Sequence, residues 1–598
     1  MLPLTRSRNR SRFFPPFSPA SLFSAGEQGA WYDPSDFSTL FTDSAGTTPV
    51  TAVEQFVGLM LDKSKGLVLG SELVTNANTA SSWAVGGTNT ATQDGSAVKI
   101  TYVDSNVGAL VFLNNGPLSG NLTAGKRYKV SFEARCDVGN SINIVAYDGS
   151  TTTSTFALTA SYQTFTVYLY FVSGTPYVGR VNDGSFGAGE SYWVRNITVR
   201  ELPGNHATQT TSAKRPKLAA RYNLLTYTEQ FDNAAWTKSG LNAFGSGSVA
   251  NTTATTDPLG GNTADYIQEN TATSAHLVIQ AATVGANVSA VFSIYAKAAE
   301  RTFLLIYPES SAGAGAGVWF NLSTGAVGTQ GSGRTGSITS VGNGWYRCTV
   351  TCSIATADYR FYAGPASADN VVSYAGTGTS GIYIWGADLR PTSQAMGLIG
   401  PTYQRVVDAA TYDAVGFLPY LQFDGIDDSM STGSIDFTAT DKMTVWAGVR
   451  KQTDATGQIL YELSASVPSN ANSFAMYAGN NASALGAFWT SQNRGNGASA
   501  ASELATTAAP TTTVLSVAHQ IQATPRTVTK TNGAVLGTLT GVADTGNYGN
   551  YPLFIGARNN ASLFFNGWLT SLIVRGAQST QGQIEATESW VNGKTGAY

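Results

Sequence analysis

Apolar and polar residues alternate along much of the chain, and this alternation is typical of β-strands with one face in a core. The run YKVSFEAR (128–135) changes from apolar to polar at every step. TFTVYLYFV (164–172) and YWVRNITVREL (192–202) are further predicted strands, and clusters of Gly, Asn, Ser and Thr separate the runs. Residues 67–203 are therefore expected to form one antiparallel β-sandwich.

Residues 222–400 repeat this plan in a diverged form, and the matched segments keep the same order. They are SSWAVGG and NAAWTKSG, GKRYKVSFEAR and NVSAVFSIYAK, and SYWVRNITVREL and SGIYIWGADLRP. Two copies in one order predict a second sandwich of the same design, in tandem with the first.

The last third of the chain, 401–598, has strand-like runs in a different layout, beginning with YLQFDGIDDSMSTGSIDF and MTVWAGVRKQ. Near the C-terminus, TQGQIEATESWVNGKTG predicts one helix, with Ile584 and Trp590 packing back on the protein and Glu588 on a polar side. A third sandwich is expected here. The fold class predicted for the chain is all-β, with tandem antiparallel β-sandwiches behind an extended N-terminal arm.

Composition and charge argue against several classes of function. Charged residues make up 12% of the chain, against about 25% in ordinary soluble domains, and the net charge is −3. Such a balance gives no field that attracts nucleic acid, and no apolar run is long enough for a membrane span. The three cysteines and three histidines are too scattered for a disulfide framework or a metal cluster of these residues.

The motifs of common enzymes are also missing from the sequence. There is no Gly-x-Ser-x-Gly elbow, His-Glu-x-x-His pair or phosphate loop, and no acidic pair stands in a recognisable glycosidase context. The protein is therefore expected not to be an enzyme and to need no cofactor, calcium excepted.

The repeated segments, 67–203 and 222–400, resemble the jelly-roll carbohydrate-binding modules that are common in phage tail proteins and glycan-active enzymes. The likeness lies in the opening Trp, a Gly-bounded strand, a strand of the form Gly-x-x-Tyr-x-Val-Ser-Phe and an aromatic closing strand. It implies sugar binding, in which exposed aromatic rings stack on the apolar faces of sugars. The alternative, that these aromatic residues fill the core, stays open. The candidates are Trp83, Tyr102, Tyr170, Tyr177, Trp193, Trp236, Tyr307, Trp319, Trp345 and Trp385, and the predicted glycan-binding residues are Trp83, Trp193, Trp236, Trp345 and Trp385.

The segment 401–598 resembles a laminin-G-like or concanavalin-A-like lectin domain. The matching positions are Tyr420–Asp428, Met443–Arg450 and Phe554–Trp568. Members of this fold bind glycans or proteins, sometimes with calcium. The carboxylates that could hold calcium are those of Asp424, Asp427 and Asp428. The alternative for this cluster is a solvated set of side chains that caps a turn.

The lead segment 29–66 is rich in apolar residues but too short to fold alone. In phage structural proteins with this lectin-like domain, a similar segment runs on through a stretch like GNHATQTTSAKRP (204–216) into the Phe-Asp-Gly strand. The resemblance implies that 29–66 completes the C-terminal sandwich, with both modules inserted into its loops. The alternative is a row of separate domains with 204–221 as a linker. The residues expected to pack on elements after residue 400 are Trp31, Phe37, Leu40 and Phe41.

Residues 1–28 form a predicted N-terminal arm in which four spaced arginines precede a Phe-rich and Pro-rich stretch. Such an arm is either a disordered tail or a peptide that orders against a partner protein. Exposed phenylalanines favour docking, because they are costly unless something covers them. The residues predicted to dock are Arg6, Arg8, Arg10, Arg12, Phe13, Phe14 and Phe17.

These resemblances imply a non-enzymatic phage virion appendage, a tail fibre or spike. Its N-terminus is expected to attach to other virion proteins, and its sandwiches to bind glycans of the host cell surface. A homotrimer is expected by analogy with fibres. The alternatives are a head-decorating or collar fibre with the same domains, then a bacterial surface adhesin, then a glycan depolymerase.

Overall fold

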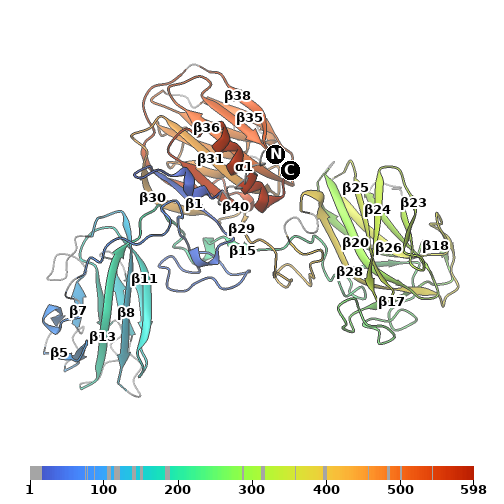
Figure 1. Cartoon of the computed structure of the whole chain (residues 1–598), viewed down its shortest axis with the longest axis horizontal. Coiled ribbons are helices and arrows are strands. Elements are labelled where there is room, and N and C mark those ends of the chain that lie inside the picture. The colour runs from blue at the N-terminus through green and yellow to red at the C-terminus, as the bar shows by residue number, and fades with distance from the viewer. Residues whose placement is uncertain are drawn as a thin grey trace, which may run out of the picture.

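The computed structural model describes residues 17–598 with several gaps. The residues left out are 75, 77, 86–87, 104–108, 113–121, 138–142, 149–151, 182–188, 286–287, 311–316, 357, 395–399, 456, 481–484, 498–500 and 542. Antiparallel strands arranged as three β-sandwiches dominate the described part, which confirms the all-β prediction (Figure 1). Within this part α1 (Gln581–Thr595) is the only α-helix, and no helix has the length and apolar character that crossing a membrane requires.

The first module, residues 67–203, has two facing sheets with the orders β11-β8-β13-β6-β5 and β10-β9-β12-β7-β4. Its strands are β4 (Ala84–Val85), β5 (Thr90–Asp94), β6 (Ala97–Thr101), β7 (Ala109–Phe112), β8 (Lys126–Cys136), β9 (Asn143–Tyr147), β10 (Thr152–Ala157), β11 (Gln163–Phe171), β12 (Tyr177–Val181) and β13 (Ser191–Glu201). The alternation in β8 sends Tyr128, Val130 and Phe132 into the core between the sheets.

The second module, residues 222–400, repeats this topology. Its sheets have the orders β24-β25-β20-β28-β17 and β23-β22-β21-β26-β19-β16, with a small β18-β27 pair beside them. The strands are β16 (Thr237–Ser239), β17 (Asp265–Gln268), β18 (Thr273–Ser274), β19 (Leu277–Thr283), β20 (Ser289–Ala298), β21 (Phe303–Ser310), β22 (Val318–Asn321), β23 (Ala326–Gln330), β24 (Arg334–Gly342), β25 (Trp345–Ser353), β26 (Asp358–Ala366), β27 (Tyr374–Ala375) and β28 (Gly381–Pro391). Strand for strand, β8, β13, β9 and β12 correspond to β20, β28, β21 and β26.

Both modules bend their central strand pair at the same point. The register of β13 on β8 shifts after Arg195 and Glu133, and that of β28 on β20 shifts beside Trp385 and Tyr295. The residue next in sequence is left-handed in both modules, with φ of 53° at Asn196 and 61° at Gly386. Asparagine and glycine tolerate this conformation, so each bulge has a residue suited to it.

The C-terminal sandwich draws its strands from three separate parts of the chain. Early strands are β1 (Gly29–Tyr32), β2 (Leu40–Phe41), β3 (Leu59–Met60), β14 (Ala207–Thr208) and β15 (Lys217–Ala219). Late strands are β29 (Tyr420–Asp424), β30 (Met430–Asp436), β31 (Lys442–Lys451), β32 (Gln458–Leu463), β33 (Ser473–Asn480), β34 (Leu485–Arg494), β35 (Ala501–Thr506), β36 (Thr511–Gln520), β37 (Thr527–Thr531), β38 (Ala534–Leu539), β39 (Asn550–Ile555) and β40 (Asn566–Arg575). The two sheets run β15-β29-β40-β31-β36-β37-β38, with β1 on β40, and β2-β3-β14-β30-β39-β32-β33-β34-β35.

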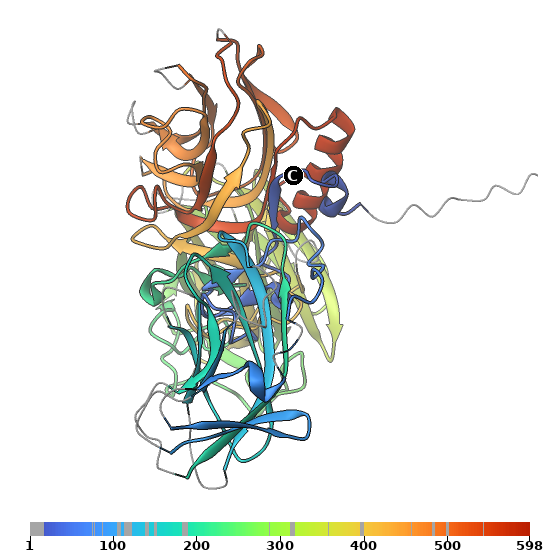
Figure 2. The ribbon, with the colours of Figure 1, turned by 90° about the vertical axis from the view of Figure 1, so that its left-hand side faces the viewer.

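Hydrogen bonds tie these distant parts into one body. Asp62 accepts from the backbone N–H of Trp31 at 2.8 Å and from that of Asn205 at 2.7 Å, while its own N–H donates to His206 Nδ1. The first module leaves this sandwich after β3 and returns at β14, and the second leaves after β15 and returns before β29. Figure 2 shows the blue N-terminal segment beside the red helix α1, where Trp31 packs edge-to-face on Trp590.

The pairings correct two parts of the sequence interpretation. Residues 204–221 are not a plain linker, because β14 and β15 both lie in the C-terminal sheets. Trp31, Phe37 and Leu40 pack with residues beyond 400, but Phe41 packs instead on Tyr168 of the first module, with ring centroids 5.0 Å apart. Phe41 lies on the face of β2 that meets this module.

Helix α1 begins with a capping box between Thr580 and Gln583. Ile584 and Trp590 pack toward the sheet as predicted. Glu588 does not face solvent, however, since it is only 3% exposed and accepts hydrogen bonds from Ser516 Oγ and Lys530 Nζ. Positions four apart share one helix face, so Glu588 follows Ile584 onto the sheet. The three cysteines are free and buried, so they form no disulfide framework, as the sequence predicted.

Candidate functional site

Two tyrosines face each other on the outer side of one sheet of the second module. Tyr362 of β26 pairs in register with Tyr307 of β21, and their ring centroids lie 5.4 Å apart in an edge-to-face arrangement. Their neighbours Phe361 and Ile306 point into the core. Because side chains alternate along a strand, the two tyrosines lie on the opposite face of the sheet.

The first module carries a tyrosine pair at the corresponding place. Tyr177 of β12 pairs in register with Tyr147 of β9, and the rings are stacked with centroids 4.8 Å apart and an interplanar angle of 18°. Sequence reasoning named Tyr177 and Tyr307 as candidates and missed Tyr147 and Tyr362. Matching β12 to β26 strand by strand would have revealed all four, but the repeat is too diverged there for sequence to set the register.

A hollow of about 610 Å³ adjoins Tyr362 on the outer face of β19 and β26. It is lined by Leu224, Thr226, Ala235, Thr237, Ile279, Gln280, Ala281, Arg360 and Tyr362. The lining combines apolar side chains with two threonines, a glutamine and one guanidinium, and it includes the ring of Tyr362. Sugar rings have apolar C–H faces and hydroxyl rims, so this combination suits a glycan.

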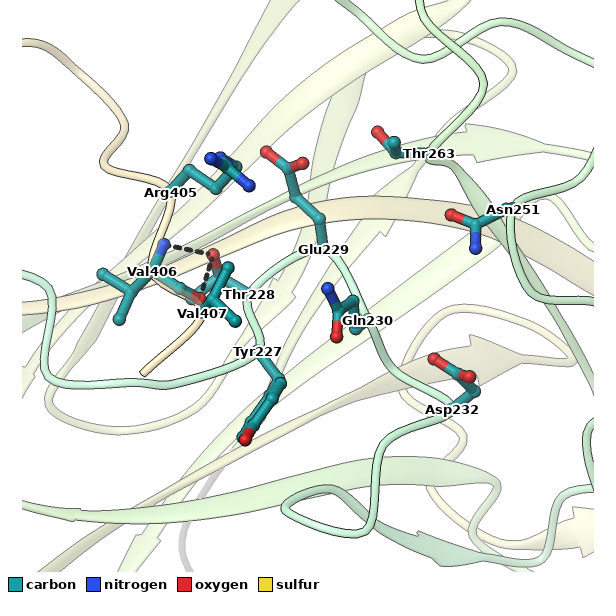
Figure 3. A pocket seen from close by; sticks show the side chains of 10 residues that line it. All are labelled: Tyr227, Thr228, Glu229, Gln230, Asp232, Asn251, Thr263, Arg405, Val406 and Val407. Atoms are coloured by element: carbon teal, nitrogen blue, oxygen red, sulfur yellow. Dashed lines mark hydrogen bonds between the residues drawn. The ribbon is translucent and has the colours of Figure 1, made fainter. Parts of the chain in front are cut away.

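A second hollow, here called the acidic cleft, lies over the other sheet of the second module. It consists of two adjoining spaces of about 240 and 700 Å³, which share Glu229, Thr263 and Arg405. Figure 3 shows the smaller space, with the Glu229 carboxylate projecting between Arg405 and Thr263. The chain just after residue 400 forms one wall, so this stretch packs on the second module before it reaches β29.

The polar groups of the acidic cleft centre on Glu229. The Tyr403 hydroxyl donates to Glu229 Oε1 at 3.0 Å and lies 2.9 Å from Thr228 Oγ1. Burial raises the pKa of Glu229, although the hydrogen bond from Tyr403 and the charge of Arg405 act in the opposite direction. The Tyr403 ring packs against Trp385, with centroids 4.9 Å apart.

All five predicted glycan-binding tryptophans are buried, so their ring faces are not open to a sugar. Their exposed fractions are 6% for Trp83, 6% for Trp193, 1% for Trp236, 0% for Trp345 and 2% for Trp385. Trp83 and Trp236 fill the cores between the sheets. Trp193 lies on an outer face, but the Arg135 guanidinium covers it at 3.7 Å from the ring centroid. A large indole gains most by leaving water, and this favours burial wherever a neighbour can cover it.

The carboxylates of Asp424, Asp427 and Asp428 do come together. Their oxygens lie within 4.8 Å of one another. Asp424 Oδ1 accepts from the backbone N–H of Ile426 at 2.8 Å, and Asp428 Oδ2 accepts from the N–H of Asp424 at 3.1 Å. Burial, and then the charges of the other two aspartates, raise the pKa of Asp428 to about 7. The cluster therefore caps its own turn, and calcium binding here stays a prediction.

The predicted docking residues fall mostly outside the described part of the chain. Six of them lie outside the described residues, and their docking role stays a prediction: Arg6, Arg8, Arg10, Arg12, Phe13 and Phe14. Phe17 packs against a cluster that includes Leu22 and Trp31 of the C-terminal sandwich. Nearby, Glu27 pairs with Arg575 at 2.7 Å, so the end of the arm is attached to this sandwich.

Comparisons with known proteins find only distant structural similarities. No family model and no curated protein matches the chain. Among solved structures, a "CBM4" protein is 19% identical over 22% of this chain and 94% of its own, with a TM-score of 0.16. A mutant of "CBM29-2", titled as a carbohydrate-binding module, is 14% identical over 22% and 85%, with a TM-score of 0.18. A Trypanosoma rangeli sialidase is 12% identical over 84% and 83%, with a TM-score of 0.22. At such scores these likenesses assign neither fold nor function to this chain.

Proposed function

We propose that the protein binds glycans through the outer sheet faces of its two modules. The observation that carries this proposal is the cross-strand tyrosine pair, which recurs on corresponding strands as Tyr147 with Tyr177 and Tyr307 with Tyr362. Neither pair belongs to the core between the sheets, although Tyr307 and Tyr362 pack with Leu305 and Trp319 in a cluster on the outer face. The recurrence of the pair in two diverged copies is what a shared ligand-binding surface requires.

The arrangement favours weak binding at each site and stronger binding by the whole chain. Tyr147 and Tyr307 are half-buried, and their partners Tyr177 and Tyr362 are 8% and 9% exposed, so each pair forms a shallow surface rather than a deep pocket. Two linked sites raise the apparent affinity without any new contact, because the second binding event becomes intramolecular. A polymeric ligand with repeated sugars can occupy both sites at once.

The biological setting we propose is a phage virion, in which the chain is a tail fibre or spike. The support is the sequence resemblance of 29–66 and 401–598 to phage proteins with a lectin-like domain. Residues 1–28 are then the arm that attaches the chain to other virion proteins, and a homotrimer is the expected assembly. A head-decorating or collar fibre with the same domains is the alternative setting.

A glycan depolymerase is the second candidate function, and one observation favours it. The raised pKa of Glu229, in a cleft beside a tyrosine hydroxyl, is a property of general acids in glycoside hydrolysis. The proposal nevertheless remains a binding protein without enzymatic activity, since the other two carboxylates of the cleft are engaged: Asp257 accepts hydrogen bonds from its own loop and Asp413 pairs with Arg405.

A glycan array followed by a reducing-sugar assay tests the two candidates. The intact protein should bind to glycans on the array. It should release no new reducing ends from the glycan that it binds best. Release of oligosaccharide that stops in Glu229→Gln would establish the depolymerase instead. A protein that binds no glycan at all would refute both.

A further inference from the structure

We propose that the acidic cleft of the second module is a binding site for a saccharide that carries a protonated amine. The site lies over the β28–β20 sheet, whereas the tyrosine pair of this module lies on the β26–β21 sheet. The two sheets face each other across the core, so a ligand in the cleft is independent of the tyrosine surface.

The size and walls of the cleft suit a small ring-shaped ligand. Its larger space measures about 700 Å³, which falls within the range of about 300–1,000 Å³ that is usual for small-molecule sites. Leu259 is 81% exposed and Val341 is 40% exposed, and both line the space. Apolar side chains held in water at the edge of a hollow are costly for a free protein and favourable once a ligand covers them.

The charges in the larger space are predominantly negative. It is lined by three carboxylates, on Glu229, Asp257 and Asp413, and by one cation, Arg405, which lies 3.5 Å from Asp413. The Asp257 oxygens already accept hydrogen bonds from the backbone of their own loop, including that of Leu259 at 2.9 Å. Glu229 is thus the carboxylate left to meet a ligand.

Glu229 is partly satisfied and partly open. Its Oε1 accepts from the Tyr403 hydroxyl, while the described residues place no hydrogen-bond donor on Oε2. A carboxylate that is withdrawn from water gains from a cationic donor more than from a neutral one, because a charge-assisted hydrogen bond is roughly twice as strong. A ligand ammonium at Oε2 supplies that donor.

The apolar walls and the carboxylate together specify the class of ligand. A sugar ring offers apolar C–H faces to Leu259, Val341 and the Tyr403 ring, and an amine on that ring reaches Glu229. A neutral sugar fits the walls but brings no positive charge to Glu229 Oε2. A small inorganic cation meets the charge but covers none of the apolar side chains.

The test is calorimetric titration of the full chain with two matched tetrasaccharides, one of β-1,4-linked glucosamine and one of β-1,4-linked N-acetylglucosamine. The amine form should bind at least tenfold more tightly. Glu229→Gln keeps the shape and removes the charge, so it should abolish this preference. Leu259→Ala, at an exposed position that is safe for folding, should weaken binding of the amine form several-fold.

Thr324→Ala, at an exposed turn of the second module that lines neither hollow, is the control and should leave titration by the amine tetrasaccharide unchanged. Tyr307→Ala separates the two proposals, because it removes a ring of the other sheet and should leave the ratio of the two affinities, which is the amine preference of the cleft, in place. Equal affinity for the two tetrasaccharides, or an unchanged preference in a folded Glu229→Gln variant, would overturn the inference.

Discussion

The two modules share the order of strands in their sheets but cover the same sheet face in opposite ways. In the first module the pair next to the bulge is Arg195 with Glu133, and in the second module it is Trp385 with Tyr295. The charged pair stays near solvent, with side chains 32% and 27% exposed. The aromatic pair is buried under segments from outside the sheet. The order of strands is thus the same although the two sequences have diverged. The outer face of the sheet is open to solvent in the first module and covered to form a cleft in the second.

The same contrast appears at the next cross-strand position. Arg135 and Trp193 of the first module correspond to Lys297 and Tyr383 of the second. Arg135 stacks on Trp193, whereas Lys297 reaches away to donate to Thr255 Oγ1 at 2.9 Å. A cation–aromatic stack closes the face of the first module without any covering segment.

Of the changes considered, removal of Trp385 or Trp193 should give the largest difference in lost unfolding free energy between the two modules. Trp385→Ala leaves a cavity under the segment after residue 400 and is expected to cost about 3–5 kcal/mol of unfolding free energy. Trp193→Ala should cost clearly less, because only side chains of its own face cover the indole. Denaturant unfolding of both variants measures the difference, and equal losses would show that the two faces are not built differently.

Breaking an ion pair should give the next largest difference in stability between the two modules. Glu269 of the second module is fully buried and accepts from Arg301, Tyr374 and Thr377. Glu269→Gln breaks this buried pair and is expected to cost about 3 kcal/mol. Glu133→Gln breaks the exposed pair of the first module and should leave the melting temperature almost unchanged. A larger effect at Glu133 would contradict the contrast.

Low pH should destabilise the second module through protonation of the same carboxylate, that of Glu269. Burial opposes ionisation of Glu269, but the hydrogen bonds from Arg301, Thr377 and Tyr374 together prevail and lower its pKa from 4.5 to about 2. The folded state therefore stays ionised where the unfolded chain takes up a proton. This stability is complete above pH 4.5 and is lost as the pH falls from 4.5 toward 2. The melting temperatures of wild type and Glu269→Gln should converge as the pH falls through this range. Two parallel curves of melting temperature against pH would show that the lowered pKa does not belong to Glu269.

The sequence predicted the fold well because its signals are local. Period-two alternation gave the strands, the repeat gave two similar sandwiches, and the likeness of 29–66 to a lead segment placed it on the C-terminal strands. Which of the tryptophans are buried could not be predicted, for a physical reason. Alternation shows which side chains leave the core of a sheet, but it does not show what later covers them, as the segment after residue 400 covers Trp385.

Tyr147, Tyr362 and Glu229 were missed for a related reason. A cross-strand pair depends on register between strands that are far apart in sequence, such as β9 and β12, and nothing local fixes that register. Glu229 stands in a loop without a motif, and only the fold brings Tyr403 to it. Single residues in loops acquire chemistry from their neighbours in space, which the sequence does not list.

The most direct test of glycan binding by the two modules is an affinity measurement on Tyr147→Ala, Tyr307→Ala and the double variant. The ligand is the polysaccharide that the wild-type protein binds best on an array. Tyr162→Ala, in the turn just before β11 of the first module, is the control. Each single variant should bind at least about tenfold more weakly because avidity is lost, and the folded double variant should not bind. A double variant that binds as tightly as the control would contradict the proposed function.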